Sequence, residues 1–284
     1  MPLPSLPTIM FEPLVRATLL EDLGRAGDLT TDAIVPQEAT ATLTFAVRQP
    51  GVIAGMGVAS CAFRTIDPTV EMTIAHPDGS SVGAGEVIAT VHGPARALLT
   101  AERTALNFLC RMSGIATATA AVVEAIHGNK ASIVCTRKTT PGLRALEKYA
   151  VRAGGGSNHR FGLDDAVLIK DNHIAIAGDI RAAIERARAG VGHLVKIEVE
   201  VDTLDQLEIA LGVGVDAVLL DNMSPEQLSR AVTMVAGRAI TEASGRVTPQ
   251  TAPAIAATGV DLISIGWLTH SAPILDIGLD YGSL

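Results

Sequence analysis

The chain has 284 residues, a formal net charge of −8, and a composition of 48% apolar but only 3% aromatic residues. A core built from Ala, Val, Leu and Ile suits a buried parallel sheet covered by helices. The acidic balance argues against nucleic acid as a partner, because binding a phosphate backbone needs an extended basic face. No uninterrupted apolar run reaches membrane-spanning length, so we expect no membrane partner.

The cysteine pattern indicates the compartment. Cys61, Cys110 and Cys135 are odd in number, widely spaced and without a Cys-x-x-Cys pair. This argues against a disulfide framework or a zinc site. Free thiols are typical of a reducing compartment, so we expect a cytoplasmic protein.

The first residues predict short, mixed elements. Apolar spacing predicts a helix over residues 9–22, and residues 27–32 are typical of a polar turn. Alternation predicts a strand over residues 41–48, and a short helix follows over residues 57–66. We therefore expect an α/β region at this end of the chain.

Residues 70–93 predict two strands joined by a tight turn at Pro77-Asp78-Gly79. The pattern resembles the hairpin of biotinyl and lipoyl carriers, but it contains no lysine that could carry the group. A structural role is therefore expected. The next segment, from Ala95 to Ile126, is helical in pattern, with a predicted break at Ser113-Gly114.

After Gly128 the chain becomes a run of strand–helix units. Predicted strands cover residues 132–135, 166–169, 194–199, 215–220, 239–243 and 260–265. Predicted helices cover residues 142–153, 179–189, 203–211, 225–236 and 249–257. Such alternation indicates parallel strands with right-handed crossovers, and this number of units favours a barrel, complete or open.

Function in such a barrel collects where the strands end. In this chain charged or small residues follow each apolar run: Arg137 and Lys138, Lys170 and Asp171, Glu198 and Glu200, Asp221 and Asn222, Glu242, Ser244 and Gly245, and Gly266. The early units supply cations, which suit carboxylates or pyrophosphate. The middle units supply carboxylates, which suit sugar hydroxyls or Mg²⁺. The last units supply glycines that suit a phosphate. Together they predict a site for a phosphorylated ribose joined to a second anionic partner.

Each of these residues also has a purely structural interpretation. The Asp and Asn residues after two strands could be helix N-caps: Asp171, Asn172, Asp221 and Asn222. For Glu198 and Glu200 we expect one side chain inside the barrel and the other paired with a helix. Gly154-Gly155-Gly156 is interpreted as a flexible loop that delivers His159 and Arg160. Arg103 could be a surface arginine on an amphipathic helix.

Seven motifs in order resemble one family. They are Glu102-Arg103-Thr104-Ala105-Leu106-Asn107, Thr136-Arg137-Lys138-Thr139-Thr140-Pro141-Gly142, Gly154-Gly155-Gly156-Ser157-Asn158-His159-Arg160, Ile169-Lys170-Asp171-Asn172-His173, Glu198-Val199-Glu200-Val201, Leu220-Asp221-Asn222 and Leu268-Thr269-His270-Ser271. Together they resemble quinolinate phosphoribosyltransferase, from Glu12 to Gly278.

The resemblance implies a fold and a reaction. The fold is an incomplete (open) α/β barrel of parallel strands with an N-terminal α/β sandwich domain. The sandwich would cover residues 1–112, with the tail 271–284 packed on it, and the barrel residues 113–270. The reaction converts quinolinate and phosphoribosyl pyrophosphate into nicotinate mononucleotide, pyrophosphate and CO₂ with Mg²⁺. The implied assembly is a homodimer in which one subunit's N-terminal domain caps the other's barrel.

The resemblance also implies roles for single residues. Arg103 would reach across the dimer interface to the partner's substrate. Arg137, Arg160 and Lys170 would bind the quinolinate carboxylates, with His159 beside them. Lys138 would face the pyrophosphate, with Thr136 also in the substrate-binding set. Glu200 and Asp221 would hold the ribose hydroxyls near Mg²⁺. The 5′-phosphate would be held by Ser244, Gly245, Arg246, Ile265, Gly266 and Trp267. The implied catalytic residues are Lys138, Lys170, Glu200 and Asp221.

Some questions stay open at this point. Arg246 and Trp267 depart from the smaller residues typical of the family. Arg246 could strengthen phosphate binding, and Trp267 could narrow the pocket or fill the barrel mouth. The group that returns a proton to the ring could be Lys138, Lys170 or His159. Alternatives are a ModD-like relative linked to molybdenum transport, a Schiff-base aldolase barrel using Lys170, or a non-catalytic binding protein.

Overall fold

The computed structural model describes residues 3–282. Within them the chain forms two compact units. The first unit comprises residues 3–120, 140–155 and 271–282, and the second comprises residues 121–139 and 156–270. Residues 113–120 and 140–155 therefore group with the first unit, although the predicted barrel covered residues 113–270. The outermost residues of the expected domains, 1–2 and 283–284, lie outside the described residues.

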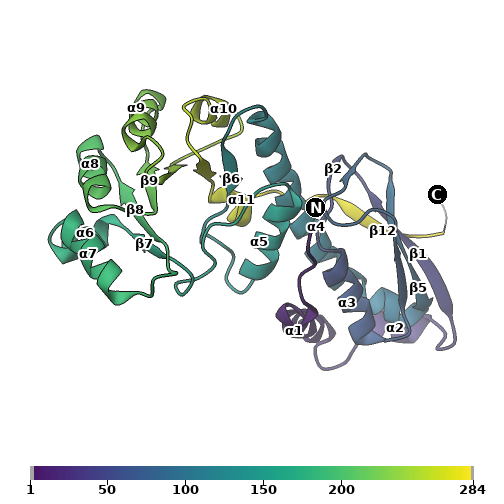
Figure 1. The fold of residues 1–284 in the computed structure, drawn as a ribbon. Coiled ribbons are helices and arrows are strands. Elements are labelled where there is room, and N and C mark those ends of the chain that lie inside the picture. Colours follow the sequence, from purple (N-terminus) through teal and green to yellow (C-terminus); the bar gives the residue numbers. More distant parts are fainter. Residues whose placement is uncertain (1–2, 283–284) are drawn as a thin grey trace. The chain divides into compact units, whose positions relative to one another are not determined.

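The first unit is built on an antiparallel sheet of order β12-β1-β5-β3. Its strands are β1 (Thr40–Val47), β3 (Glu71–Ile74), β5 (Val87–Pro94) and β12 (Ile277–Tyr281), with a separate pair β2 (Gly51–Val52) and β4 (Ser81–Val82). Its helices are η1 (Thr8–Met10), α1 (Glu12–Leu23), α2 (Leu29–Ile34), α3 (Met56–Ile66), α4 (Ala95–Ala125, which runs on into the second unit) and α5 (Arg144–Ala153). Figure 1 shows β12, the last strand of the chain, beside β1.

The core of the first unit lies between the sheet and α3. Phe45 on β1 and Phe63 on α3 are fully buried, and their rings meet edge to face with centroids 6.0 Å apart. Three sequence predictions were wrong here. Residues 29–34 form a helix rather than a turn, because the Asp28 carboxylate accepts the Thr31 N–H at 3.0 Å and caps it.

The second prediction, two strands joined directly by a tight turn at Pro77-Asp78-Gly79, was wrong about the connection but right about the turn, in which the Ser80 N–H donates to the Pro77 carbonyl at 3.0 Å. Strands β3 and β5 do pair, but their connection is long and includes β4. Asp78 has another function, because its Oδ1 accepts the N–H groups of Gly55 and Met56 at 3.0 Å each. These bonds satisfy donors at the first turn of α3.

The third wrong prediction is the helix break, because α4 runs unbroken through Ser113-Gly114. Ser113 accepts the Ala54 N–H at 3.0 Å, and a Cβ on Gly114 would overlap the Pro273 carbonyl. The small residues thus permit close packing. By length and composition α4 could cross a membrane, but 61% of its most apolar 18-residue stretch is buried inside the protein.

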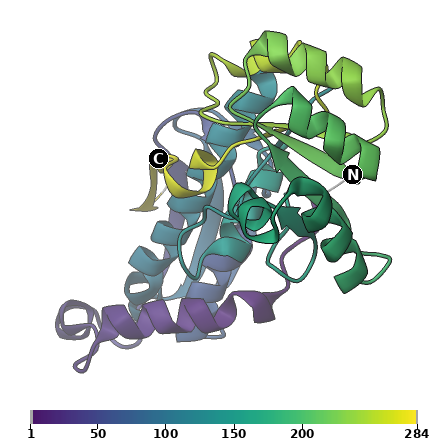
Figure 2. The same cartoon turned by 90° about the vertical axis from the view of Figure 1, so that its left-hand side faces the viewer.

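The second unit is a six-stranded parallel sheet of order β6-β11-β10-β9-β8-β7. The strands are β6 (Ser132–Val134), β7 (Val167–Ile169), β8 (Ile197–Val201), β9 (Ala217–Asp221), β10 (Ile240–Ser244) and β11 (Leu262–Ser264). The helices are α6 (Asp171–Ala177), α7 (Ile180–Gly190), α8 (Leu204–Val213), α9 (Pro225–Val235), α10 (Ala252–Ala256) and α11 (Trp267–His270). The predicted open barrel is confirmed: β6 and β7 are the two edges, and α7, α8, α9 and α10 cover the outer side (Figures 1 and 2).

The free edge of β6 is used by the glycine-rich loop. The Ser157 N–H donates to the Ile133 carbonyl at 2.8 Å, and the Cys135 N–H donates to the Ser157 carbonyl at 3.2 Å. The loop therefore runs beside β6 like a short strand, which fixes the direction in which Asn158, His159 and Arg160 leave it.

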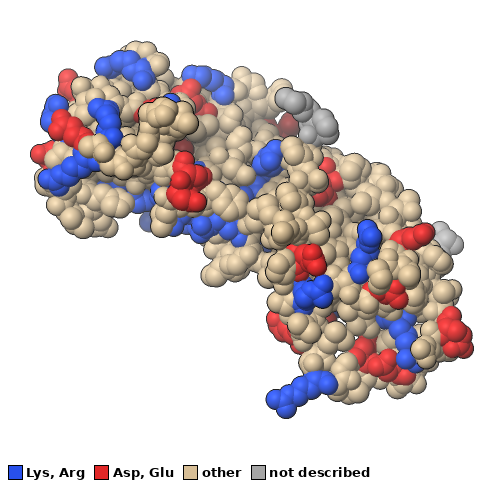
Figure 3. Space-filling view, turned by 60° about the horizontal axis from the view of Figure 1, so that its bottom comes forward, with Lys and Arg blue, Asp and Glu red and all other residues tan. Residues whose placement is uncertain are grey.

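Lysine and arginine side chains are interspersed with Asp and Glu over the face shown in Figure 3.

Candidate active site

Two adjoining cavities lie at the carboxyl ends of the barrel strands. The first, of about 420 Å³, is lined by Thr136, Arg137, Lys138, His159, Arg160, Leu168, Lys170, Glu200, Leu219, Asp221, Glu242, Ser244 and Ser264. The second, of about 360 Å³, is lined by Thr136, Lys138, Asp221, Asn222, Ser244, Gly245, Arg246, Val247, Ser264, Ile265, Gly266, Trp267 and His270. Five residues line both cavities, so the two are continuous.

Every residue of the second unit to which the resemblance gave a role lines one of these cavities, whereas Asp171 and Glu198, also predicted at strand ends, line neither. The predicted cations and carboxylates lie in the first, and the predicted phosphate loop lies in the second. Arg103 belongs to the first unit, where it is exposed on α4 and lines a separate cavity of about 300 Å³ beside Asp22 and Asp28. Ser264 and His270 also line the site; the sequence did not single out Ser264, and it gave His270 a place in a motif but no role.

Two guanidinium groups, Arg137 and Arg160, lie close enough to influence each other. Burial, and then the positive charge of Arg137, lowers the pKa of Arg160 from its usual value. Arg160 is held by a hydrogen bond from its Nη1 to the Ala166 carbonyl at 3.1 Å. The Nε of Arg137 is buried and has no hydrogen-bond partner among the described residues. Two such neighbours create a site that favours an anion.

Lys170 extends from the end of β7 and pairs with Glu200 on β8. Its Nζ donates to Glu200 Oε2 at 2.9 Å. The backbone of Lys170 is fixed as well, because its N–H donates to His173 Nδ1 at 2.9 Å. His173 therefore orients the start of α6. This is a structural role for the histidine that ends the Lys170-Asp171-Asn172-His173 motif.

His159 lies between two glutamates. Its Nε2 is 2.9 Å from Glu198 Oε2 and 3.6 Å from Glu242 Oε1. Both Glu198 and Glu200 thus contact site residues, so the expectation that one of them would face outward was wrong. The physical reason is that residues two apart on a strand point to the same face. Glu198 pairs with a histidine and Glu200 with a lysine, rather than with a helix.

Glu242 is the most buried ionisable group of the site, with a side chain only 2% exposed. Burial, and then the negative charge of Glu198, raises the pKa of Glu242 to about 7. Its Oε1 has no hydrogen-bond partner among the described residues. The sequence placed Glu242 at a strand end but gave it no role, because its partners are far away along the chain.

The ligating atoms of His159, Glu198 and Glu242 lie within 4.8 Å of one another, which is a spacing compatible with a metal ion. The hydrogen bonds favour another interpretation. The Arg160 N–H donates to His159 Nδ1 at 2.7 Å, so this nitrogen is unprotonated. The proton of a neutral ring is therefore on Nε2, where it points at Glu198 and leaves no lone pair for a metal.

Two glycines line the second cavity where the main chain is closely approached, and at one of them the backbone itself favours glycine. Gly245 has φ +116°, and a Cβ there would overlap Oδ1 of Asn222. At Gly266 a Cβ would lie 2.8 Å from Cδ of Lys138. Both glycines let main chain approach the cavity closely, as a phosphate-binding loop requires.

Trp267 and Arg246, the two departures from the family pattern, have different environments. The Trp267 indole N–H donates to the Val247 carbonyl at 2.8 Å and so joins α11 to the loop after β10. Trp267 is half-buried and lines the second cavity, whereas Arg246 is exposed with φ 44°. Beside them, the Thr269 hydroxyl donates to the Lys138 carbonyl at 2.8 Å and holds that loop.

The alternative of plain N-caps is wrong for the residues after β9. The N-cap of α9 is Ser224, whose hydroxyl accepts the Gln227 N–H. Asp221 instead lines both cavities, and its Oδ2 accepts a hydrogen bond from Asn222 Nδ2 at 2.6 Å. Asp171 and Asn172 lie in the first turn of α6, whose N-cap is Lys170.

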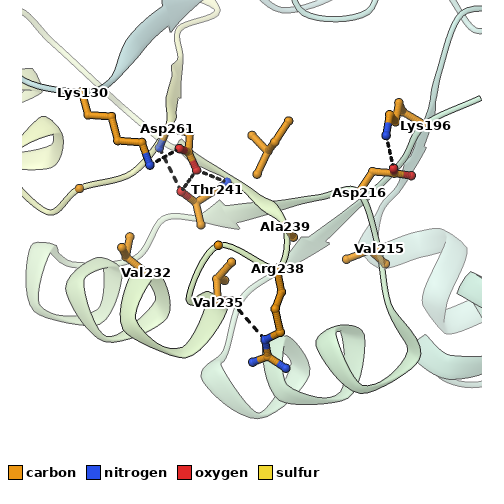
Figure 4. A pocket seen from close by; sticks show the side chains of 13 residues that line it. Lys130, Lys196, Val215, Asp216, Val232, Val235, Arg238, Ala239, Thr241 and Asp261 are labelled. Atoms are coloured by element: carbon orange, nitrogen blue, oxygen red, sulfur yellow. Dashed lines mark hydrogen bonds and ion pairs between the residues drawn. The ribbon is translucent and has the colours of Figure 1, made fainter.

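A larger cavity, of about 510 Å³, opens near the amino ends of the strands (Figure 4). Its lysines are paired: Lys130 with Asp261, and Lys196 with Asp216, each at 2.5 Å. Arg238 donates to the Val235 and Met234 carbonyls at the end of α9. Each lysine is thus paired with a carboxylate, and Arg238 is hydrogen-bonded to main-chain carbonyls. In barrels of this kind, residues at the amino ends of the strands contribute to stability rather than to catalysis.

Two family models together match most of the chain. The N-terminal domain of quinolinate phosphoribosyl transferase matches residues 28–113, and its C-terminal domain matches residues 115–280. A probable nicotinate-nucleotide pyrophosphorylase (carboxylating) of Bacillus subtilis is 44% identical over 96% of this chain and 93% of its own. The Mycobacterium leprae enzyme of the same name is 47% identical over 94% of this chain and 95% of its own.

Solved structures agree in fold. NadC from Streptococcus pyogenes superimposes with a TM-score of 0.94 at 41% identity, over 99% of this chain and 100% of that chain. The nicotinate-nucleotide pyrophosphorylase from Francisella tularensis gives 0.94 at 38% identity, over 98% of each chain. The chain belongs to the quinolinate phosphoribosyl transferase family.

Proposed function

We propose that this protein transfers the phosphoribosyl group of phosphoribosyl pyrophosphate to quinolinate with loss of CO₂. The products are nicotinate mononucleotide and pyrophosphate, and the reaction belongs to NAD biosynthesis. The observation that carries this proposal is the pair Arg137 and Arg160, adjacent cations with a buried, unpartnered Nε on Arg137. Quinolinate is a flat dianion, and guanidinium groups recognise carboxylates in two-point contacts.

The carboxylates of quinolinate would contact Arg137, Arg160 and Lys170, which line one cavity. Lys170 is paired with Glu200 in the free protein, and a substrate carboxylate would take its place. His159 would lie against the ring, held by its bonds to the Arg160 main chain and to Glu198. The ring would thus be fixed in plane.

Ribose and pyrophosphate would occupy the boundary between the two cavities. Glu200 and Asp221 offer carboxylates to the ribose hydroxyls, and Lys138 offers its ammonium to the pyrophosphate. Mg²⁺ would be carried by the pyrophosphate, where it offsets negative charge, and hard carboxylate oxygens near by fit such an ion. The 5′-phosphate would lie on the second cavity's loops, against Ser244, Gly245, Arg246, Ile265, Gly266 and Trp267.

The chemistry needs charge stabilisation rather than an enzyme nucleophile. As pyrophosphate leaves, the ribose carbon gains positive character that Glu200 and Asp221 can stabilise. The ring nitrogen then bonds to that carbon. The positive charge of the quaternised nitrogen stabilises the electron pair that remains on the neighbouring ring carbon when CO₂ leaves. A cavity with little water favours this loss.

Assembly and location are part of the same proposal. We infer a homodimer in which Arg103 of one subunit contacts the substrate of the other. Arg103 is exposed on α4, and it is available to a second chain in that position. The three cysteines are free thiols, which fits a reducing cytoplasm.

The main rival reaction is a Schiff-base aldolase that uses Lys170. An imine-forming lysine must present a neutral amine, whereas Lys170 donates to Glu200 at 2.9 Å. Borohydride treatment with a carbonyl substrate would inactivate an aldolase irreversibly. We expect full activity to remain after such treatment. A ModD-like role is disfavoured by the cavity that gathers Arg137, Lys138 and Lys170 together.

The direct test is a turnover assay with quinolinate, phosphoribosyl pyrophosphate and Mg²⁺. We expect equal amounts of nicotinate mononucleotide, pyrophosphate and CO₂. Nicotinate in place of quinolinate serves as a control, because it lacks the second carboxylate and should react poorly. A folded protein that releases none of these products from quinolinate would refute the proposal.

A further inference from the structure

The proposed reaction leaves one atom unassigned, and the inference that follows rests on that reaction. When CO₂ leaves, the carbon–carbon bond breaks and its electron pair stays on the ring carbon next to nitrogen. That carbon must then form a bond to a proton. The donor must be an acid that faces the substrate cavity.

His159 is a poor donor in this structure. Its Nδ1 accepts the Arg160 N–H at 2.7 Å, so no proton can sit there without breaking that bond. Its Nε2 lies 2.9 Å from Glu198 Oε2, so the Nε2 proton points at a carboxylate. Lys170 is likewise engaged by Glu200 at 2.9 Å. Lys170 keeps two further N–H groups, but the proposed reaction places Lys170 on a quinolinate carboxylate and Lys138 on the pyrophosphate, so each lysine already binds an anion.

Glu242 differs from them in its surroundings. It lines the same cavity as Arg137 and Lys170, yet its side chain is only 2% exposed. In the sheet it lies opposite Leu219 on β9 and Leu262 on β11, so the neighbouring strands place no charge directly beside it. The ionisable groups acting on it are Glu198 and His159. Ser264 is the nearby polar neighbour on β11.

We propose that Glu242 is the acid that donates a proton to the ring carbon after CO₂ loss, and that His159 and Glu198 are positioning residues. The O–H bond of Glu242 breaks, the ring carbon takes the proton, and Glu242 becomes a carboxylate. Solvent protonates Glu242 again after the product leaves. No oxidant, reductant or further reactant is needed.

The electrostatics of the cluster support this role. Burial, and then the negative charge of Glu198, raises the pKa of Glu242 to about 7. A carboxyl group with that pKa holds its proton at mildly acidic pH and shares it near neutrality, which is the range that suits a general acid. Ser264 forms a side-chain hydrogen bond with the carboxyl group, but Oε1 has no hydrogen-bond partner among the described residues, so one carboxyl oxygen is left for the substrate.

The test follows two products in a single turnover, with enzyme in excess over quinolinate. Wild-type enzyme should release pyrophosphate and form nicotinate mononucleotide, which checks the proposed reaction itself. In Glu242→Gln, pyrophosphate should appear close to the wild-type rate, because phosphoribosyl transfer precedes the proton step. Nicotinate mononucleotide should form at least about 100-fold more slowly, the usual effect of a lost general acid. The phosphoribosylated dicarboxylate should accumulate.

Glu198→Gln is the matched control, because it changes a glutamate of the same cluster to the same amide. It should weaken quinolinate binding through His159, and it should separate the two products far less than Glu242→Gln does, because burial, the larger cause of the raised pKa of Glu242, remains. Glu242→Asp should recover part of the mononucleotide rate. Equal slowing of both products in Glu242→Gln, or no separation between them, would overturn the assignment. Pyrophosphate release by the variant also shows that it is folded.

Discussion

Lys170 Nζ donates a hydrogen bond to Glu200 Oε2 across 2.9 Å, which joins the ends of neighbouring strands β7 and β8. The Lys170 side chain is 48% exposed and that of Glu200 only 14%. The lysine can therefore turn toward a ligand, whereas Glu200 stays largely buried and needs a new partner. A substrate carboxylate that takes Lys170 would release Glu200 for a ribose hydroxyl, so one substrate prepares the site of the other.

The first prediction concerns this lysine. Lys170→Ala should lower kcat/KM for quinolinate by about 10- to 100-fold, since a hydrogen bond between charged groups contributes roughly 1.5–3 kcal/mol. Steady-state kinetics with varied quinolinate measures it. Lys196→Ala is the control: Lys196 is also paired with a carboxylate, Asp216, but lies near the amino ends of the strands. An equal loss in both variants would contradict the role of Lys170.

The second prediction concerns stability and pH. In the folded protein the pKa of Glu242 is raised from 4.5 to about 7. Folding therefore favours the protonated form. The resulting stabilisation is fully present below pH 4.5 and is lost as pH rises toward about 7.

Glu242→Gln removes this titration while keeping the shape of the side chain. Its Tm should match that of the wild type near pH 4.5 and exceed it by several degrees at pH 8, at roughly 2–4 °C per kcal/mol. Thermal unfolding of both proteins across this pH range gives the difference. A Tm difference that does not change with pH would show that Glu242 ionises normally.

Much of the barrel could be predicted because its signals are local. Apolar strands followed by charged residues identified the strand ends, and the order of the motifs placed cations and carboxylates at one end of one sheet. The resemblance implied an open barrel, but only the fold shows what covers the edge at β6. Ser157 bonds beside β6, and no local pattern around the glycines indicated this pairing.

The cluster of His159, Glu198 and Glu242 could not be predicted, because it depends on distant segments meeting inside the barrel. Local rules also failed where side chains bond at long range. Ser113-Gly114 is typical of a break, but it permits contact with Ala54 and Pro273 instead. In each case tertiary packing decided the role of a residue whose local preference suggested another.

The third prediction concerns the phosphate loop. Gly245→Ala should raise KM for phosphoribosyl pyrophosphate by about tenfold or more, because φ +116° is strained for alanine and the new Cβ would meet Asn222. Gly212→Ala is the matched control, since Gly212 lies in α8 and a Cβ added there would have nothing within 4 Å. KM for quinolinate should change less than KM for the phosphorylated substrate. An unchanged KM for that substrate would place the phosphate elsewhere.

The fourth prediction concerns Arg103. If Arg103 serves the partner's substrate, Arg103→Ala and Arg137→Ala should each be nearly inactive as homodimers. Mixed after dissociation, they should regain about a quarter of wild-type activity. Half of the dimers are then heterodimers, and one of two sites in each heterodimer is intact.

Two differently tagged subunits allow the heterodimer to be isolated and its activity measured directly. The purified heterodimer should have about half of the wild-type activity, because one site combines an intact Arg137 with the partner's intact Arg103. Lys138→Ala mixed with Arg137→Ala is the control. Both residues line the barrel cavity of one chain, so each heterodimer site would lack one of them. An inactive Arg103 and Arg137 heterodimer would mean that Arg103 serves its own chain, because no site would then be complete.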